Sequence, residues 1–146
     1  MAYAILMVDD SEIVIESLRR WLKLDGYEVV VATNCAEAMA AASRRRFAAH
    51  ILDLELADGL GVDLALWLKR EGHTAQTIFY TGHSFGNCLL EQAERVGHVV
   101  TKGASPHTLL RVLRTLVNAS PEVRSPEHAA SSRSQCIRLA PTRKTG

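Results

Sequence analysis

The stretch "ILDLELADG", residues 51–59, places an acidic residue, Asp53, directly after a short apolar run. A carboxylate at the end of a buried strand is costly unless a hydrogen bond or an opposite charge compensates its lost hydration. The pattern therefore predicts one of two things. Either Asp53 belongs to a site that binds a cation or reacts, or the segment is not a strand.

Five short apolar runs divide residues 1–118. The first run, "YAILMV", is continuous rather than alternating, which is typical of a strand that is covered on both faces. The five predicted strands span residues 3–8, 28–32, 49–54, 77–82 and 98–102.

The stretches that follow the strands carry helix start and stop signals. Asn34 with Glu37 three residues later predicts a capping box, and Ser105 with Pro106 predicts an N-cap and a first helical position. Gly26 can end the first helix. The expected helices span roughly residues 11–25, 36–46, 62–70, 89–96 and 106–117. Strands that alternate with helices predict an α/β fold with a doubly wound, five-stranded parallel sheet.

Composition narrows the possible functions. The chain has 146 residues, is 47% apolar and carries a formal net charge of +1. This charge gives no field that favours nucleic acid or a membrane surface as partner. There is no run of roughly 18 apolar residues and no basic leader, so we expect a cytoplasmic protein without a membrane span. The three cysteines form no CxxC pair, so thiol-based metal or redox chemistry is not expected.

Residues 119–146 differ from the rest of the chain. The segment is rich in Ser, Pro and Arg and has few apolar residues. Such a composition buries too little surface to offset chain entropy, so we expect a disordered tail. The alternative is a docking segment that folds on a partner, through "CIRLA" at residues 136–140.

Polar residues end four of the predicted strands. Asp9 and Asp10 end the first strand, Asp53 the third, Thr81 the fourth and Lys102 the fifth. In a parallel sheet all carboxyl-terminal strand ends lie at one edge, where ligands bind. We therefore expect these side chains to converge.

The converging set has a chemical logic. Carboxylates about 4–6 Å apart repel one another by roughly 1–4 kcal/mol per pair at a surface-like dielectric. A hard cation such as Mg²⁺ reverses that repulsion, and an aspartate can act as a nucleophile that forms an aspartyl phosphate. A Lys ammonium and a Thr hydroxyl can contact the oxygens of a phosphoryl group.

These residues resemble the receiver domain of two-component response regulators, the CheY-like family, over residues 3–118. The resemblance implies a flavodoxin-like sheet of order 2-1-3-4-5 with five helices. It also implies that Asp53 is the phosphoacceptor, receiving its phosphoryl group from a histidine kinase or a histidine phosphotransfer protein. Thr81 and Lys102 would contact that group.

The resemblance further implies a Mg²⁺ or Mn²⁺ site. Asp10 would bind the ion directly and Asp9 mainly through water. Asp53 and the backbone carbonyl of Glu55 would complete the protein ligands.

Several positions depart from the family pattern. Gly103 replaces the usual proline after Lys102, and because a non-proline cis bond costs roughly 3–4 kcal/mol, we expect a trans bond and an altered loop. Val99 occupies the position of the switch aromatic, so inward rotation of a Tyr or Phe cannot operate there. His83 and Glu55 are positioned to affect how water or donors reach the phosphoryl group. The loop before residue 98 looks shortened.

The expected function is that of a single-domain response regulator, not an enzyme, that signals through protein contacts. The 28 residues after Asn118 are too few and too polar for a DNA-binding module. By resemblance, the contact face includes the fourth and fifth helices and the fifth strand. Two alternatives remain open: a phosphorylation-independent adaptor module, and a hydrolase with Asp53 as nucleophile and Glu55 as general acid or base.

Overall fold

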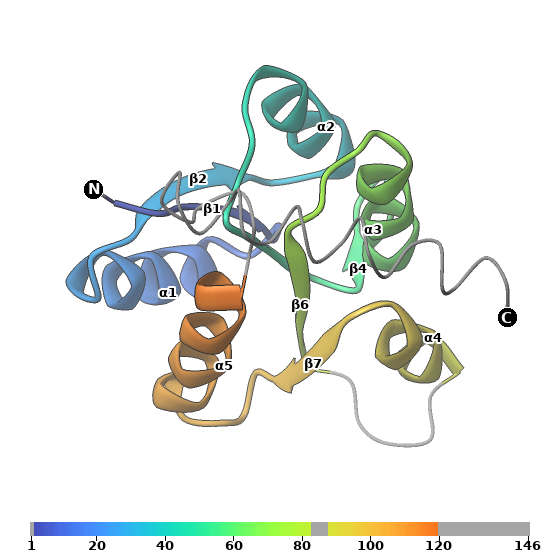
Figure 1. Ribbon diagram of the computed structural model, residues 1–146. Coiled ribbons are helices and arrows are strands. Elements are labelled where there is room, and N and C mark those ends of the chain that lie inside the picture. The colour runs from blue at the N-terminus through green and yellow to red at the C-terminus, as the bar shows by residue number, and fades with distance from the viewer. Residues whose placement is uncertain (1, 83–87, 120–146) are drawn as a thin grey trace, which may run out of the picture.

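Five parallel strands form the central sheet, in the order β2-β1-β3-β6-β7 (Figure 1). The computed structural model describes residues 2–82 and 88–119. The strands are β1 (Ala4–Val8), β2 (Glu28–Ala32), β3 (Ala49–Leu52), β6 (Gln76–Thr81) and β7 (His98–Thr101). This order is the expected 2-1-3-4-5, and the predicted α/β class is confirmed.

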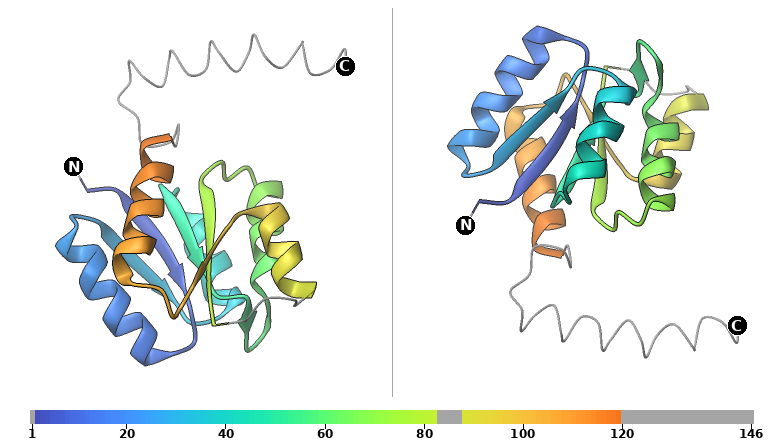
Figure 2. Two further views of the ribbon diagram at one scale, coloured as in Figure 1. Left: turned by 90° about the horizontal axis from the view of Figure 1, so that it is seen from below. Right: turned by 90° about the horizontal axis from the view of Figure 1, so that it is seen from above.

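Five helices cover the two faces of the sheet. They are α1 (Glu12–Leu24), α2 (Cys35–Arg44), α3 (Gly61–Arg70), α4 (Cys88–Val96) and α5 (Pro106–Ala119). Helices α1 and α5 pack on one face and α2, α3 and α4 on the other, as the views along the sheet show (Figure 2). The expected tail lies outside the described residues, apart from Ala119, the last residue of α5.

The core has two parts, one on each face of the sheet. Along β1, Leu6 and Val8 cluster with apolar residues of α2, α3 and α4, whereas Ile5 and Met7 cluster with α1 and α5. All of these side chains are buried. Each contributes about 1.5–3 kcal/mol relative to an exposed position. Two-sided burial therefore explains the continuous apolar run and fixes the strand from which the first acids emerge.

The predicted N-caps at Asn34 and Ser105 are present, but the capping box of α2 differs from the prediction because Glu37 accepts from Thr33 rather than from the N-cap Asn34. The Asn34 side chain accepts a hydrogen bond from the Glu37 N–H at 2.8 Å, and the Glu37 carboxylate accepts from the Thr33 N–H at 2.8 Å. The Ser105 hydroxyl accepts from the His107 N–H at 3.3 Å at the start of α5. The Asn34 and Ser105 side chains thus satisfy amide groups of the first helical turn that have no partner inside the helix.

A small hairpin between β3 and α3 was not predicted. Its strands, β4 (Glu55–Leu56) and β5 (Gly59–Leu60), pair antiparallel. The predicted strand 49–54 is correspondingly shorter, because the ladder of β3 ends at Leu52. The chain thus turns back immediately after Asp53 instead of continuing as a strand.

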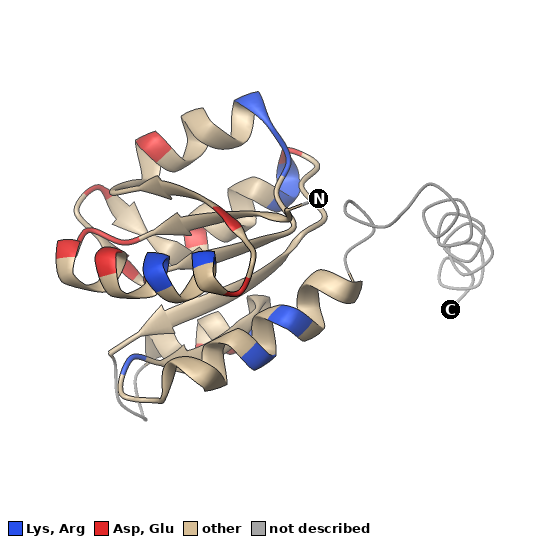
Figure 3. Cartoon of the chain, turned by 90° about the vertical axis from the view of Figure 1, so that its left-hand side faces the viewer, with Lys and Arg blue, Asp and Glu red and all other residues tan. Residues whose placement is uncertain are grey.

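Three further features concern the loop before β7, the charged residues and the length of the helices. Only Gly97 separates α4 from β7, so the loop before residue 98 is short. In the view of Figure 3, acidic and basic residues both occur along the helices and at the strand ends. Among residues 2–82 and 88–119, no helix combines the length and apolar character needed to cross a membrane.

Candidate functional site: an acidic cluster at the carboxyl edge of the sheet

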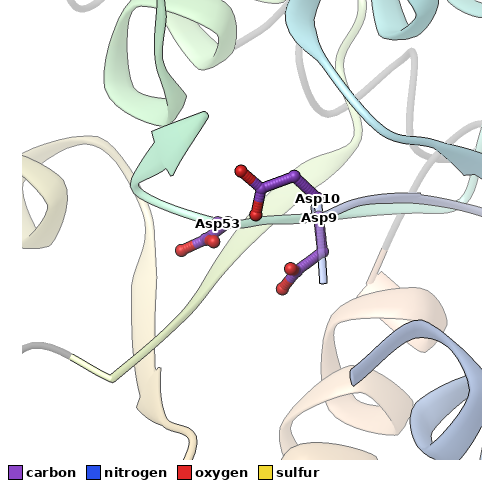
Figure 4. Close-up of side chains that lie close together, drawn as sticks. All are labelled: Asp9, Asp10 and Asp53. Carbon is purple, nitrogen blue, oxygen red and sulfur yellow. The ribbon is translucent and has the colours of Figure 1, made fainter. Parts of the chain in front are cut away.

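Three carboxylates from two neighbouring strands meet at the carboxyl edge of the sheet (Figure 4). Asp9 and Asp10 follow β1, Asp53 follows β3, and one carboxylate oxygen of each lies within 4.8 Å of the others. Backbone hydrogen bonds hold the strand ends. The Asp53 N–H donates to the Val8 carbonyl at 2.9 Å, and the Asp9 N–H donates to the Ala32 carbonyl at 3.1 Å. The predicted convergence of the three acids is therefore present.

Lys102, the residue after β7, brings a positive charge to the cluster. Its Nζ lies 3.0 Å from Asp9 Oδ2 and 3.4 Å from Asp53 Oδ2. The Lys102 N–H donates to the Thr81 carbonyl at 2.7 Å, which ties the end of β7 to the end of β6. A single ammonium group thus faces two carboxylates.

Burial shapes the electrostatics of this group. The pKa of Asp53 is raised, first by burial and then by the negative charge of Asp9, while Lys102 and the Leu54 N–H oppose the rise without cancelling it. Burial lowers the pKa of Lys102, but its hydrogen bonds and charge interactions with Asp9 and Asp53 outweigh burial, so that the pKa is raised overall. An ionised Asp53 therefore carries a free-energy penalty that an added cation would relieve.

The two acids after β1 have different surroundings. Asp9 is buried, and its Oδ1 accepts a hydrogen bond from the Ser11 N–H at 2.9 Å while its Oδ2 pairs with Lys102. Asp10 is exposed. Its carboxylate therefore forms the solvent-facing side of the cluster.

Of the other predicted site residues, Thr81 and Val99 lie on the expected strands, whereas Glu55 lies in the hairpin that was not predicted. Thr81 is the fully buried last residue of β6. Val99 is half-buried in β7, in register with Phe79. Glu55 is exposed at the start of β4.

Two departures from the family pattern concern the loops at this edge. The Lys102–Gly103 bond is trans, as predicted, since the described residues contain no cis peptide bond. His83, expected near the phosphoryl site, lies outside the described residues.

The donor set fits a hard divalent cation. All three candidate ligands offer carboxylate oxygens, and Mg²⁺ prefers oxygen ligands while keeping several of its waters. The exposed Asp10 leaves the cluster open on one side, so water can complete the coordination of an ion. Mg²⁺ or Mn²⁺ therefore suits these residues better than a metal that selects sulfur or nitrogen.

Sequence reasoning missed two residues that fix the loop after Asp53. The Asp58 carboxylate accepts hydrogen bonds from the first amides of α2, and Gly61 lies against the Asp53 backbone. The dipeptide Asp58-Gly59 was an available signal. Gly favours the last position of a type I turn, and Asp-Gly between apolar residues is typical of hairpins.

Comparison with known proteins agrees with this geometry. The sequence profile of the response regulator receiver domain matches residues 5–114. The alginate biosynthesis transcriptional regulatory protein AlgB of Pseudomonas aeruginosa is 30% identical over 107 residues, which make up 72% of this chain and 24% of that protein. The chain thus spans about a quarter of the length of this relative.

Solved structures show the same fold. The signal receiver domain of a signal transduction histidine kinase from Syntrophus aciditrophicus superposes with a TM-score of 0.75 at 26% identity, covering 85% of this chain and 96% of that one. The receiver domain of the sensor histidine kinase PA1611 from Pseudomonas aeruginosa, solved with magnesium coordinated in its active site cleft, gives 0.74 at 20% identity. That match covers 81% of this chain and 99% of the other. With the profile spanning most of its length, this chain belongs to the response regulator receiver domain family, a signalling module of two-component systems.

Proposed function

We propose that this chain accepts a phosphoryl group on Asp53 from the phosphohistidine of a histidine kinase or a histidine phosphotransfer protein. The observation that carries the proposal is the meeting of Asp9, Asp10 and Asp53 with the Lys102 ammonium at one sheet edge. In the transfer, an oxygen of Asp53 forms a bond to phosphorus while the phosphorus–nitrogen bond of the donor breaks. The bonding electron pair leaves with the imidazole nitrogen, which takes up a proton from water.

The residues around Asp53 have separate tasks in this proposal. Asp10 and Asp53, with the Glu55 carbonyl, hold Mg²⁺ or Mn²⁺, and Asp9, whose two oxygens already accept hydrogen bonds, contacts it through water. When bound, the ion supplies positive charge that stabilises the phosphoryl oxygens. The receiver domain of PA1611, solved with magnesium in its active site cleft, supports this assignment by analogy.

Lys102 and Thr81 serve the phosphoryl group itself. The Lys102 ammonium already lies 3.4 Å from Asp53 Oδ2, so it is near the position where a transferred phosphoryl oxygen would carry negative charge. The Thr81 hydroxyl donates a hydrogen bond to another of these oxygens. Both groups neutralise charge that the phosphoryl group adds to an already acidic site.

Output in this proposal comes from contact with another protein, in a phosphorelay in the cytoplasm. Phosphorylation shifts a two-state equilibrium, and a shift from 1:99 to 99:1 requires about 5.5 kcal/mol of differential stabilisation. The downstream target contacts the face formed by α4, β7 and α5. The unit that carries this function is the receiver domain, residues 1–118.

A second candidate function is an adaptor that binds its partner without phosphorylation. The observation that favours it is Val99 in β7, because this side chain has no ring to rotate inward and report the state of Asp53. In this case the acidic cluster remains but the binding surface stays constant.

Phosphotransfer decides between the two. Wild-type protein and Asp53→Asn are incubated with a small acyl-phosphate donor, and separately with phosphorylated kinases, each with and without Mg²⁺. We expect labelling of the wild type only, and only with metal, measured by intact mass and by gel retardation of the phosphoprotein. Asp63→Asn, on an exposed acid of α3, is the matched control and is expected to be labelled like the wild type.

Labelling that persists in Asp53→Asn contradicts the assignment of the phosphoacceptor. No labelling of the wild type by any donor favours the adaptor, as does an Asp53→Asn variant that keeps full biological activity. Steady release of phosphate from an ester substrate would instead point to a hydrolase.

A further inference from the structure

The loop after Asp53 is folded into the β4–β5 hairpin. Glu55 pairs with Leu60 and Leu56 with Gly59, so that only two residues form the turn. This hairpin carries the backbone of Glu55, the proposed carbonyl ligand of the metal. Its position therefore sets where that carbonyl lies relative to the Asp53 carboxylate.

The turn of the hairpin is attached to α2 through Asp58. Asp58 Oδ1 accepts a hydrogen bond from the Cys35 N–H at 2.7 Å, and Oδ2 accepts from the Ala36 N–H at 3.1 Å. These are the first two amides of α2, which have no acceptor within the helix and lie at its positive end. The bonds from Cys35 and Ala36 lower the pKa of Asp58, so its carboxylate stays ionised at neutral pH.

Packing brings the hairpin close to the same helix. A Cβ atom at Gly59 would lie 3.2 Å from Cys35 Sγ, which is tighter than ordinary van der Waals contact. Leu56 is buried in the same apolar cluster as Cys35 and Ala38. Asp58 thus adds two charge-assisted hydrogen bonds to an apolar contact. Together these interactions fix both the orientation of the hairpin and its distance from α2.

The other end of the hairpin is held against Asp53. The Gly61 N–H donates to the Leu54 carbonyl at 2.8 Å. A Cβ atom at Gly61 would overlap the Asp53 carbonyl oxygen and would lie 3.0 Å from the Asp53 carbonyl carbon. Only glycine therefore allows the chain to pass this close to the backbone of the proposed phosphoacceptor.

We propose that Asp58 is a positioning residue for the phosphoacceptor site, because it anchors the β4–β5 hairpin to α2 and so holds the Asp53–Glu55 backbone in the metal-binding position. Gly61 is the second fixed point of the same loop. The inference rests on the proposed function for its consequence, which is metal affinity, but its structural part concerns the hairpin alone. Asp58 touches neither metal nor phosphoryl group and acts through the backbone it anchors.

The test compares two caps of one helix. Asp58→Ala removes the bonds from the hairpin to α2, whereas Asn34→Ala removes the 2.8 Å bond to the Glu37 N–H, which caps α2 without touching the hairpin. Mg²⁺ affinity, measured by calorimetric titration of the full chain, is expected to weaken about tenfold in Asp58→Ala, the lower end of what the loss of outer-sphere partners costs. Asn34→Ala is expected to bind Mg²⁺ like the wild type.

A second readout does not depend on the metal. Hydrogen exchange of the Gly61 amide, measured by NMR in metal-free protein, is expected to be several-fold faster in Asp58→Ala and unchanged in Asn34→Ala. Asp58→Asn, which keeps one acceptor oxygen for two N–H groups, is expected to fall between wild type and Asp58→Ala in both measurements. Gly61→Ala probes the second fixed point, but its overlap threatens folding itself, so Asp58 carries the test.

The outcomes separate this inference from the proposed function. Wild-type Mg²⁺ affinity and wild-type Gly61 exchange in Asp58→Ala overturn the positioning role. Equal losses in Asp58→Ala and Asn34→Ala also overturn it, because they reflect a weakened α2. A wild type that binds no Mg²⁺ defeats the proposed metal site, while faster Gly61 exchange in Asp58→Ala alone still upholds the anchoring of the hairpin.

Discussion

Two buried ionisable residues, His50 and Asp53, lie three positions apart, within and just after β3, in opposite circumstances. Asp53 emerges at the carboxyl edge, where Lys102 lies 3.4 Å from its carboxylate. His50 lies inside the sheet, 1% exposed, and neither of its ring nitrogens has a hydrogen-bond partner within the part of the chain that the structure describes. Its ring packs edge-on against those of Phe47 and His73, with centroids 6.2 and 6.0 Å away.

Burial shifts the pKa values of these two residues in opposite directions. At both residues burial disfavours the ionised form. It raises the pKa of Asp53, and it lowers the pKa of His50 to about 4, with a smaller contribution from His73. Only Asp53 has a cation beside it. At the carboxyl edge, Lys102 compensates the negative charge of an ionised Asp53. In the interior, His50 is neutral at pH 7 because its pKa is lowered to about 4.

The largest effect of pH on stability is expected at His50. The pKa of His50 is lowered to about 4 in the folded protein, against a usual 6.5, so below pH 6.5 the unfolded chain binds a proton that the folded chain excludes. Stability is thus retained above pH 6.5 and lost as the pH falls towards 4. Between pH 7 and pH 5 this loss is about 2 kcal/mol. Urea unfolding at a series of pH values measures it.

The control isolates His50 from other titrating groups. His50→Leu is expected to flatten the pH dependence by about that amount, while His98→Gln, which removes an exposed imidazole of β7, keeps the wild-type curve. A His50→Leu variant that loses stability between pH 7 and pH 5 as steeply as the wild type contradicts the exclusion of a proton from His50.

Sequence reasoning predicted the end of β1 and the convergence of the acids that follow β1 and β3, because strand burial leaves continuous apolar runs and a parallel sheet brings its carboxyl ends to one edge. The predicted third and fourth strands, 49–54 and 77–82, extend past the ends of β3 at Leu52 and β6 at Thr81. It could not predict the partner of Asp58, since Cys35 lies 23 residues away in the chain. A hairpin with two residues per strand is also too short to show periodicity. The sequence also did not predict that His50 is buried without hydrogen-bond partners among the described residues, because a single polar residue within an apolar run does not indicate its surroundings.

A smaller effect of opposite sign is expected at Asp53. Its pKa is raised in the folded state, so at neutral pH its ionisation destabilises the fold, and this penalty is relieved as the pH falls through the folded pKa. Asp53→Asn is therefore expected to be more stable than the wild type at pH 7, by on the order of 1 kcal/mol. Thermal unfolding in metal-free buffer measures the gain, and Glu94→Gln, at an exposed position of α4, is the control.

Added Mg²⁺ is expected to reduce the stability difference between Asp53→Asn and the wild type. An ion that binds only the folded state stabilises it by about 1.4 kcal/mol at ten times its dissociation constant. The wild type offers three carboxylates and the variant two, so the wild type gains more from added Mg²⁺. An Asp53→Asn variant that is less stable than the wild type without metal would contradict the penalty assigned to the buried carboxylate.

The smallest effect is expected at an ion pair away from the cluster. Arg45, at the end of α2, places its Nη1 2.8 Å from Glu28 Oε2, but the two side chains are 43% and 50% exposed. Water and salt screen such a pair, and holding two long side chains together costs entropy. Glu28→Gln is therefore expected to change the free energy of unfolding by less than about 0.5 kcal/mol, and by less still at high salt.

The same Coulomb attraction acts between Lys102 and Asp9, whose side chains are only 24% and 4% exposed. Removing one partner there leaves a buried charge without compensation, which is far more costly than loss of an exposed pair. Lys102→Met is accordingly expected to destabilise the protein several times more than Glu28→Gln in parallel urea titrations. Equal effects would mean that burial does not distinguish the two pairs, since the nitrogen–oxygen distances, 3.0 Å for Lys102–Asp9 and 2.8 Å for Arg45–Glu28, are nearly the same.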